Sequence, residues 1–422
     1  MSNWEVSKLH DWVIAGDIEL GRGDIISKDD INNFPGPYPI YSSSAHRNGK
    51  FGEYAKYMFD EELITWSVDG GGNFFYRPKH KFSVTNVCGY MRIKTGNLHA
   101  PFIYYCLSGQ HRYLTFDYTT KAHPSVIRRL YWLPRIEVVA QQKIAHILQT
   151  IDQTIEKTAA LIEKYQQIKA GLMHDLFTRG IGADGKLRPL REQAPELYQQ
   201  TPIGWIPKEW EPLKLKDILE RFGGYLQTGP FGSQLHAHEY THEGIPVVMP
   251  QDINEGKIEE AQIARIAEYR AQSLLKHRLK ASDIIIARRG ELSRAAAITS
   301  LERGWVCGTG CFLLRLGGTD LDARFFSHMY QHTVIQQQVA GLAVGTTMPS
   351  LNNEIMGKLI FPYMSKVEQS LISDKVDLVT DKVTTLRLEL AKLYNKKSGL
   401  MHDLLTGKVQ VQQNEPEVLD GL

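Results

Sequence analysis

The sequence GLMHDL occurs twice in this chain of 422 residues, at positions 171–176 and 399–404. Six identical residues repeated at an offset of 228 positions indicate a duplicated structural unit, because identities of this length rarely arise by chance. Upstream of both copies, apolar residues recur at intervals of three and four, the period of a helix with one buried stripe. A lysine, Lys169 or Lys397, interrupts both stripes at the same place. The two helices are therefore predicted to be structural copies.

Each stripe covers at least 33 residues, from Ile144 to Leu176 in the first copy, which corresponds to about 50 Å of helix. One small domain cannot cover a stripe of this length, so we expect the two helices to bury their stripes against each other. A globular domain between the helices allows the chain to return antiparallel. The residues predicted to pair the helices are Ile144, Leu148, Ile151, Ile155, Ile162, Tyr165, Leu172, Ile372, Val376, Val379, Val383, Leu386, Leu390, Leu393 and Leu400.

Local signals mark where the two helices begin. Pro134 and Pro362 share the offset of 228 and precede the stripes, where a proline is tolerated and discourages helix further upstream. Ser365 and Glu368 fit a capping box at the start of the second helix.

A weaker repeat opens the two globular domains, at an offset of 206 positions. It matches Trp4, Glu5, Lys8, Leu9 and Asp11 with Trp210, Glu211, Lys214, Leu215 and Asp217. Near the end of each domain, a second match relates Thr119, Thr120, Pro124 and Ser125 to Thr346, Thr347, Pro349 and Ser350. Little similarity lies between these borders, which predicts two similar frames that carry different surfaces.

We therefore predict an α/β (α+β) fold with two globular domains separated by two long helices, which form an antiparallel coiled coil in a pseudo-twofold circular arrangement. The expected boundaries are a first domain at 1–135, a first helix at 136–180, a linker at 181–206, a second domain at 207–362, a second helix at 363–408 and a frayed tail at 409–422. The linker is assigned because residues 178–207 are rich in glycine, proline and charge and show no sustained period.

The composition is typical of a globular multidomain protein, with 42% hydrophobic and 23% charged residues. No apolar run approaches the roughly 18 residues of a membrane span, and the N-terminus has no apolar signal core, so we expect a cytoplasmic protein.

The widely spaced cysteines are expected to be reduced structural thiols, at Cys88, Cys106, Cys307 and Cys311. The formal net charge of +2 neither supports nor excludes a nucleic-acid partner.

Several catalytic motifs are absent from the sequence. It has no Pro-Pro pair, which the Asp/Asn-Pro-Pro-aromatic loop of amino-methylating DNA enzymes requires, and no Gly-Lys pair followed by Ser or Thr, as in phosphate-binding loops. The Pro-Asp pair that usually begins the metal site of restriction nucleases is also missing. His236, His238 and His242 near Glu239 offer metal ligands, but an HxH pair is a weak signal, and we expect no metal and no cofactor in this chain. Residues 70–72, three glycines, lack the GxGxxG spacing of a dinucleotide loop and predict a tight turn.

Three stretches of the second domain are candidates for contact with DNA. The apolar strand at 283–287 leads directly to basic residues whose guanidinium groups match phosphates and guanine edges, although a solvated basic turn is the alternative. The loop YLQTGPFGSQLHAHEY at 225–240 offers donors and acceptors for base edges. The late element GTTMPSLNN at 345–353 serves backbone or base contacts, or forms only a structural turn. The candidates are Arg288, Arg289, Arg294, Gln227, Ser233, Gln234, His236, Thr346, Thr347, Ser350 and Asn352.

The first domain offers a comparable set. The loop YSSSAHRNGKF at 41–51 supplies polar and basic side chains, the counterpart of the late element lies near 121–125, and further candidates flank the glycine turn. Trp66 also flanks that turn but is assigned to the core. The candidates for DNA contact are Ser42, Ser43, His46, Arg47, Asn48, Asn73, Arg77, Lys121, His123 and Ser125.

In combination, these motifs resemble the specificity subunit of type I restriction and modification systems. The matching phrases span nearly the whole chain and comprise GLMHDLFTRG from Gly171, ELYQQTPIGWIPKEWE from Glu196, TGPFGSQL from Thr228, DIIIARRG from Asp283, TTMPSLN from Thr346 and GLMHDLLTGKV from Gly399. The first domain departs most from the family pattern, so its base contacts are the least transferable.

The resemblance implies a subunit without a catalytic centre, in which two target recognition domains each read one half of a split, asymmetric site in double-stranded DNA. The paired helices would set the spacer between the half-sites and dock two methyltransferase subunits, to which motor-nuclease (restriction) subunits are added for cleavage. S-adenosylmethionine, ATP and Mg would belong to these partners. Two alternatives remain at this point: a self-contained DNA methyltransferase or nuclease with unrecognised motifs, and a coiled-coil adaptor that does not bind DNA.

Overall fold

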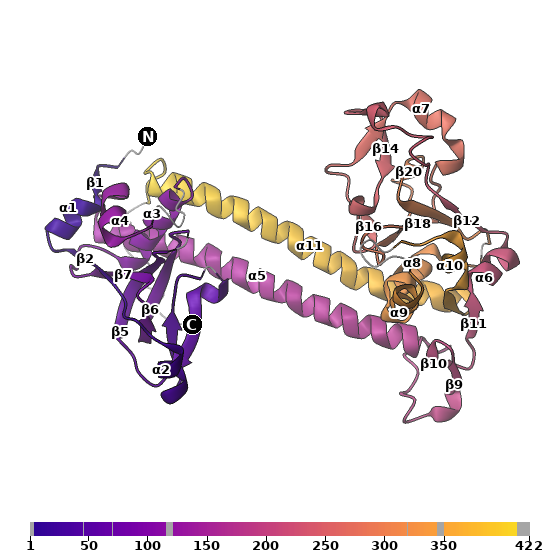
Figure 1. Ribbon diagram of the computed structural model, residues 1–422, viewed down its shortest axis with the longest axis horizontal. Helices are drawn as coiled ribbons and strands as arrows, with labels where there is room; N and C mark the ends of the chain where they lie inside the picture. Colours follow the sequence, from indigo (N-terminus) through magenta and orange to yellow (C-terminus); the bar gives the residue numbers. More distant parts are fainter. Residues whose placement is uncertain are drawn as a thin grey trace, which may run out of the picture. The chain divides into compact units, whose positions relative to one another are not determined.

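The computed structural model describes residues 4–44, 46–69, 71–114, 121–318, 320–343 and 350–411. The chain divides into two compact units, Met1–Leu161 with Leu386–Leu422 (unit 1) and Ile162–Thr385 (unit 2). Each unit contains one globular domain and part of each of two long helices, α5 (Val138–Thr178) and α11 (Lys366–Leu405) (Figure 1). This confirms the predicted α/β fold with a duplicated domain and helix. Within the described ranges, no helix is long and apolar enough to cross a membrane.

Unit 1 is built on a six-stranded sheet with the strand order β2-β7-β5-β6-β3-β4, in which only β3 and β6 are parallel. A bridge between Asp24 and Thr85 joins the segment after β2 to the turn after β6. The elements of this domain are β1 (Val6–Lys8), α1 (Leu9–Ile14), β2 (Ile18–Arg22), α2 (Lys28–Asn33), β3 (Tyr38–Tyr41), η1 (His46–Gly49), β4 (Lys50–Tyr54), β5 (Phe59–Ser67), β6 (Phe74–Val84), β7 (Cys88–Ile93), α3 (Ala100–His111), α4 (Pro124–Leu130) and β8 (Trp132–Pro134).

The core of unit 1 lies where α3 meets the sheet and the long helices. Trp66 and Met91 from the sheet, Phe102 from α3, Ile144 from α5 and Leu404 from α11 belong to one buried cluster. Trp66 is fully buried and donates its indole N–H to the carbonyl of Ala122 at 2.7 Å, which confirms its assignment to the core.

Unit 2 contains two four-stranded sheets, with the orders β12-β21-β18-β19 and β13-β17-β14-β20. Strand β18 is buried along its whole length, as its uninterrupted apolar run predicts. The elements are η2 (Pro195–Leu197), β9 (Tyr198–Thr201), β10 (Gly204–Pro207), β11 (Glu211–Lys214), α6 (Leu215–Phe222), β12 (Tyr225–Thr228), η3 (Ala237–Glu239), β13 (Tyr240–Thr241), β14 (Ile245–Val248), η4 (Pro250–Asp252), β15 (Ile253–Asn254), β16 (Lys257–Ile258), β17 (Ala264–Ile266), α7 (Glu268–Ser273), η5 (Leu275–His277), β18 (Asp283–Ala287), β19 (Ala295–Ala297), β20 (Val306–Cys307), β21 (Cys311–Arg315), α8 (Ala323–Gln331), α9 (Thr333–Leu342), α10 (Asn353–Lys358) and β22 (Ile360–Tyr363).

The two domains share a frame in which the first strand pairs with the last. In unit 1, β1 pairs with β8 in a register that places Val6 opposite Pro134. In unit 2, β11 pairs with β22 and places Pro212 opposite Pro362, which are the positions 206 and 228 residues further along the chain. The two sequence repeats therefore meet in one ladder in each unit, and the predicted duplication is confirmed at the level of individual residue pairs.

The apolar stripes of α5 and α11 are buried inside each unit. Unit 1 joins the first part of α5 to the last part of α11, and unit 2 joins the last part of α5 to the first part of α11, as antiparallel helices require. Of the predicted pairing residues, those that are buried are Ile144, Leu148, Ile151, Ile155, Ile162, Ile372, Val376, Val383 and Leu386, and those that are half-buried are Tyr165, Leu172, Val379, Leu390, Leu393 and Leu400. Lys397 is accommodated in its stripe because its Nζ lies 2.6 Å from the Asp152 carboxylate.

The segment predicted as a linker is instead folded onto unit 2. Strands β9 and β10 form a hairpin within it. Arg188 is buried, and its guanidinium forms a salt bridge with Glu368 of α11 at 2.5 Å. Ile181 also donates its backbone N–H to that carboxylate at 2.8 Å. The capping box prediction was therefore half wrong: Ser365 accepts from the backbone N–H of Glu368 at 3.3 Å, but the Glu368 carboxylate serves the linker segment.

A tryptophan on a left-handed glycine marks the end of both long helices. Trp210 lies against Gly180 (φ +65), two residues after α5, and Trp4 lies against Gly407 (φ +71), two residues after α11. A methyl group at Gly180 would overlap both the Trp210 ring and the Glu368 carboxylate. Only glycine therefore fits there, for steric and for conformational reasons.

We expect Gly180→Ala to lower the free energy of unfolding by about 3 kcal/mol, because it adds a steric clash to the cost of a left-handed alanine. Gly185→Ala is the matched control, since Gly185 is also left-handed (φ +76) but has no atom near the added methyl group. It should cost only about 1 kcal/mol in urea or thermal unfolding. Equal losses for the two variants would contradict this explanation.

A buried histidine makes unit 2 sensitive to acid. Burial lowers the pKa of His332 to about 4, with a further contribution from nearby His174. Its Nδ1 accepts from the backbone N–H of Val334 at 3.4 Å, at the start of α9. The folded chain therefore keeps this imidazole neutral at pH values where the unfolded chain, with a histidine pKa near 6.5, already protonates it.

The stability that this difference supplies should be complete above about pH 6.5 and should be lost as the pH falls toward 4, by on the order of 2 kcal/mol. His332→Asn keeps a side chain that can accept from Val334 but does not titrate in this range. Its unfolding free energy should depend less on pH between 6.5 and 4 than that of the natural chain. Identical pH profiles for the two proteins would refute the assignment.

Candidate nucleic-acid interface

Four loops of unit 2 meet at one edge of the sheet β12-β21-β18-β19. The turn after β12 bonds to the start of β21, where Gly229 donates its N–H to the carbonyl of Cys311 at 2.8 Å. After β18, Arg288 donates its backbone N–H to Gly310 at 2.8 Å and accepts from Leu351 at 3.1 Å. The stretches after Thr228, after Ala287 and around Ser350, which are distant in the sequence, therefore form one surface.

The exposed part of this surface is polar and basic. Ser233, Gln234 and His236 are exposed in the turn between β12 and η3, and Arg289 is exposed after β18. His236 and His238 stack with their ring centroids 5.4 Å apart. Such a surface can donate hydrogen bonds to phosphate oxygens and to base edges.

Arg288 connects two of the loops and is only half exposed. Its Nε donates to the carbonyl of Leu351 at 3.1 Å, and its guanidinium lies 5.9 Å from the centroid of the exposed Phe231 ring. Burial lowers the pKa of Arg288, and the positive charge of Arg289 lowers it further. The two adjacent arginines therefore concentrate positive charge at this edge.

Several residues predicted to contact DNA have structural partners in unit 2, Arg294, Gln227 and Asn352 among them. Arg294 forms an ion pair with Glu291 and donates to the carbonyl oxygens of residues 250, 251 and 253. Gln227 donates to the carbonyl of Lys276, and the Asn352 side chain accepts from the Ile355 N–H at 2.8 Å as the cap of α10. These side chains therefore bond to the backbone of neighbouring segments. Ser350 is half-buried beside Arg289, and Thr346 and Thr347 lie outside the described residues.

In unit 1, the turn Thr85–Val87 joins the candidate loops. Thr85 donates its hydroxyl to Ser42 at 2.9 Å, and Val68, at the hairpin after β5, donates its N–H to Val87 at 2.9 Å. The hairpin also holds the late element, because Lys121 forms an ion pair with Asp69 at 3.1 Å. The three stretches predicted from the sequence thus belong to one region here too.

The individual residues of this region differ in accessibility. Asn48 and Lys121 are exposed, and Ser42, Ser43 and Asn73 are half-buried. His123 and Ser125 are exposed, but they bond to each other as the cap of α4. His46 and Arg47 lie in η1, and their side chains are outside the described part of the chain.

Arg77 is the clearest departure from the predicted DNA contacts. Its side chain is 1% exposed and donates to Thr65 Oγ1 at 3.0 Å and to the carbonyl of Asn48 at 2.8 Å. The guanidinium carbon also lies 3.6 Å from the centroid of the Tyr41 ring, and burial lowers the Arg77 pKa to about 10. Arg77 therefore supports the loop that ends at the left-handed Asn48 (φ 55) and does not face solvent.

Some residues of the surface were missed by sequence reasoning. Thr309 and Gly310 lie between the turn after β12 and the loop after β18, because Thr309 donates its hydroxyl to the carbonyl of Pro230 at 2.9 Å and Gly310 accepts from the N–H of Arg288. The sequence signal for these residues is the pair of glycines on either side of Thr309, which is typical of a close backbone approach. Gly308 makes such an approach, because a side chain at Gly229 would collide with its carbonyl. Among the residues that the structure describes, no three His, Cys, Asp or Glu side chains are placed to hold a metal ion together.

Comparison with known proteins connects both units to one family. A family model described as "Type I restriction modification DNA specificity domain" matches residues 1–167 and 207–393. The chain is 21% identical over 426 residues to the type I restriction enzyme MjaVIII specificity subunit of Methanocaldococcus jannaschii, over 97% of this chain and 94% of that protein. It is 30% identical over 211 residues to a putative type I specificity subunit of Mycoplasma pneumoniae, over 49% of this chain and 50% of that protein.

A solved structure has the same fold. A crystal structure of a type I restriction-modification system S subunit from M. genitalium matches with a TM-score of 0.64 at 18% identity, over 96% of each chain. The architecture of both units is therefore one that experiment has already observed.

We expect Arg289→Ala to weaken binding of genomic duplex fragments by about 1 kcal/mol and to lower the slope of affinity against salt by about one counterion, without changing stability. Arg294→Ala should lower the stability of the chain and leave its affinity for DNA unchanged, because the Arg294 side chain bonds to Glu291 and to three backbone carbonyl groups. Binding across a salt series and thermal unfolding separate the two effects. Unchanged affinity in Arg289→Ala would exclude this turn from the interface.

Proposed function

Because this chain belongs to the type I restriction modification DNA specificity family, we propose that it is the sequence-reading subunit of a restriction and modification complex. Each globular domain reads one half of a bipartite DNA site. The domain surfaces differ in sequence and in loop structure, so the two half-sites should be unlike each other.

One observation carries this proposal. The two domains share a frame to the level of single residue pairs in the ladders β1·β8 and β11·β22, whereas their sheets and exposed loops are different. A duplicated frame with two unlike polar surfaces is what recognition of two unlike sequences requires. A coiled-coil adaptor without a DNA partner would not need the arginine-bearing edge or its supporting hydrogen bonds.

The long helices give the complex its spacing and its docking sites. Helix α5 contains 41 residues and α11 contains 40, which corresponds to about 60 Å each. Helices with mutually buried stripes resist bending, so they fix the number of unread base pairs between the half-sites. Their outer faces would bind two methyltransferase subunits.

The chemistry belongs to the partners in this proposal. The methyltransferase subunits supply S-adenosylmethionine, and motor-nuclease subunits supply ATP and Mg, while this chain binds no cofactor. A complex that acts on chromosomal DNA would work in the cytoplasm. These assignments rest on family membership and on the missing catalytic motifs, such as the Pro-Pro pair.

The test is to express the chain with its methyltransferase partner in a host that lacks both, and to map modified bases in the genomic DNA. We expect methylation at a single asymmetric motif with two defined half-sites and a fixed gap. Expression of the partner without this chain should leave that motif unmodified. Methylation that needs only the partner, or that follows no bipartite motif, would refute the proposal.

The purified chain provides the second measurement. Alone, it should neither transfer methyl groups nor cleave DNA, whereas adding the methyltransferase subunit should restore transfer. Turnover of S-adenosylmethionine by the chain alone would favour the self-contained enzyme.

A further inference from the structure

The first turn of each long helix carries a buried glutamine at an equivalent position. Gln141 in α5 and Gln369 in α11 are separated by the repeat offset of 228. Their side chains are 1% and 0% exposed, although glutamine is usually a surface residue. A buried amide needs partners for its hydrogen-bonding groups.

Gln141 binds three backbone groups of unit 1. Its Oε1 accepts from the N–H of His99 at 2.9 Å. Its Nε2 donates to the carbonyls of Asn97 and Ile136, both at 2.9 Å. The side chain therefore uses its donors and its acceptor together.

Gln369 repeats this pattern in unit 2. Its Oε1 accepts from the N–H of Asp322 at 2.9 Å, and its Nε2 donates to the carbonyls of Asp320 at 3.4 Å and Met364 at 2.8 Å. Met364 and Ile136 are again related by the offset of 228. The two glutamines thus form the same clip, although the domains that they hold have different sheets.

The clip joins three chain segments at a single point. His99 and Asp322 are the N-cap residues of α3 and α8, the domain helices whose side chains Tyr105 and Arg324 bond to the long helices. Ile136 and Met364 lie between the last strand of each domain and its long helix. Each glutamine consequently fixes the direction in which its domain leaves the helix.

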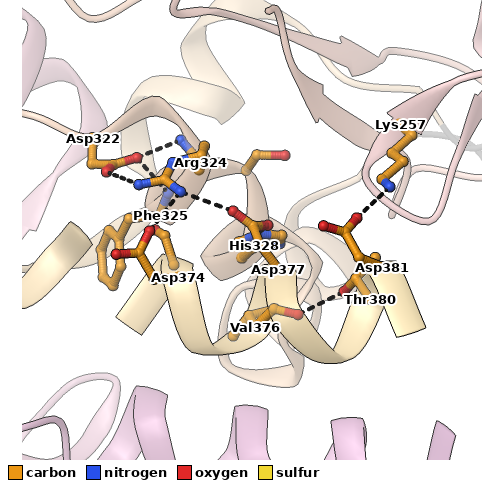
Figure 2. Close-up of polar contacts among 12 residues, drawn as sticks. Lys257, Asp322, Arg324, Phe325, His328, Asp374, Val376, Asp377, Thr380 and Asp381 are labelled. Atoms are coloured by element: carbon orange, nitrogen blue, oxygen red, sulfur yellow. Dashed lines mark hydrogen bonds and ion pairs between the residues drawn. The ribbon is translucent and has the colours of Figure 1, made fainter. Parts of the chain in front are cut away.

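Beyond the clip, the two units are held differently. In unit 2, Arg324 of α8 pairs with Asp374 at 2.8 Å and with Asp377 at 3.0 Å, and Lys257 pairs with Asp381 at 2.7 Å (Figure 2). All three carboxylates project from α11 toward the domain, as Figure 2 shows. This arrangement braces the domain along about two turns of the helix.

Unit 1 has a smaller brace. Tyr105 of α3 donates its hydroxyl to Asp152 of α5 at 2.7 Å, and Asp152 also pairs with Lys397. The positions of α5 that match the three aspartates of α11 are His146, Gln149 and Gln153, which carry no carboxylate. Because these positions lack the carboxylates of α11, we expect unit 1 to depend more strongly on its glutamine clip, although Arg112 and Trp4 also bond to α11.

We propose that Gln141 and Gln369 are positioning residues that fix the angle of each recognition domain on its long helix, and so restrict the spacer length that the complex accepts. The inference rests on the proposed function, because it concerns how two half-sites are read together. Without the clip, each unit loses three hydrogen bonds between the glutamine side chain and the backbone of the domain and its exit segment, so the domain can tilt on the helix. In unit 2, a groove of about 870 Å³ lies between the domain and α11, lined among others by Lys257, Arg324 and Asp381.

The geometry of DNA makes this restriction measurable. Adding one base pair moves a half-site by about 3.4 Å along the helix axis and rotates it around that axis. A rigidly held domain cannot follow both movements, whereas a domain that tilts can follow them in part. Loss of the clip should therefore relax the spacing preference and leave the base preference of each half-site unchanged.

The experiment uses the complex of the chain with its methyltransferase partner. Duplexes carry the mapped target with its natural spacer, or with a spacer one base pair shorter or longer. The variants are Gln141→Met and Gln369→Met, which keep the side-chain length and remove the hydrogen bonds. Gln142→Met, an exposed neighbour in α5, is the matched control. Gln141→Asn and Gln369→Asn keep an amide on a shorter stem and are used if the methionine variants do not fold.

We expect the methylation ratio of natural to altered spacer to fall about tenfold in Gln141→Met and by less in Gln369→Met, where the ion pairs still brace the domain. Mismatches in either half-site should still abolish methylation, and Gln142→Met should behave as the natural chain. Adding Asp377→Asn to Gln369→Met removes one of the three bracing carboxylates and should lower the ratio further toward that of Gln141→Met.

Two results would overturn the inference, and they are distinguishable. If every folded clip variant keeps the natural spacing ratio while stability or total activity falls, the glutamines have only a structural role. If the natural complex itself ignores the half-sites, the proposed function fails, and the inference fails with it.

Discussion

The architecture depends on two apolar stripes that are too long for any single domain to bury. Each stripe is covered by the other helix and by the base of a globular domain, so every compact unit must contain parts of both helices. The polar interruption of a stripe is accepted because it finds a partner, as Lys397 does in Asp152. The burial of these stripes therefore determines where the domains attach to the helices, independently of the residues on the domain surfaces.

Each domain combines a repeated base with a variable edge. The base consists of the first and last strands, the glutamine clip and the tryptophan on a left-handed glycine, and it recurs in both units. The edge consists of loops tied together by backbone hydrogen bonds, as between Arg288 and Leu351. Because support and contact come from different residues, the contact surface can change without altering how the domain is mounted.

Sequence reasoning predicted the features that rest on periodicity and repetition. The helices were expected at 136–180 and 363–408 and lie at Val138–Thr178 and Lys366–Leu405. The structure brings the candidate stretches of each domain together, and their contact with DNA stays a prediction. The direction of single side chains was not predictable, because Arg77 and Arg294 meet their partners only through tertiary contacts. The linker was misjudged because its anchor, the Arg188 pair with Glu368, spans 180 residues.

The composition of the two units has a consequence for synthesis on the ribosome. Unit 2 is one continuous stretch, Ile162–Thr385, and can close as soon as that stretch has emerged. Unit 1 combines Met1–Leu161 with Leu386–Leu422, so Trp4 can contact Gly407 only after the whole of unit 2 has been synthesised. The unit whose synthesis begins first is therefore the last to fold completely. Until the last part of α11 has been synthesised, the first part of the α5 stripe lacks its partner helix.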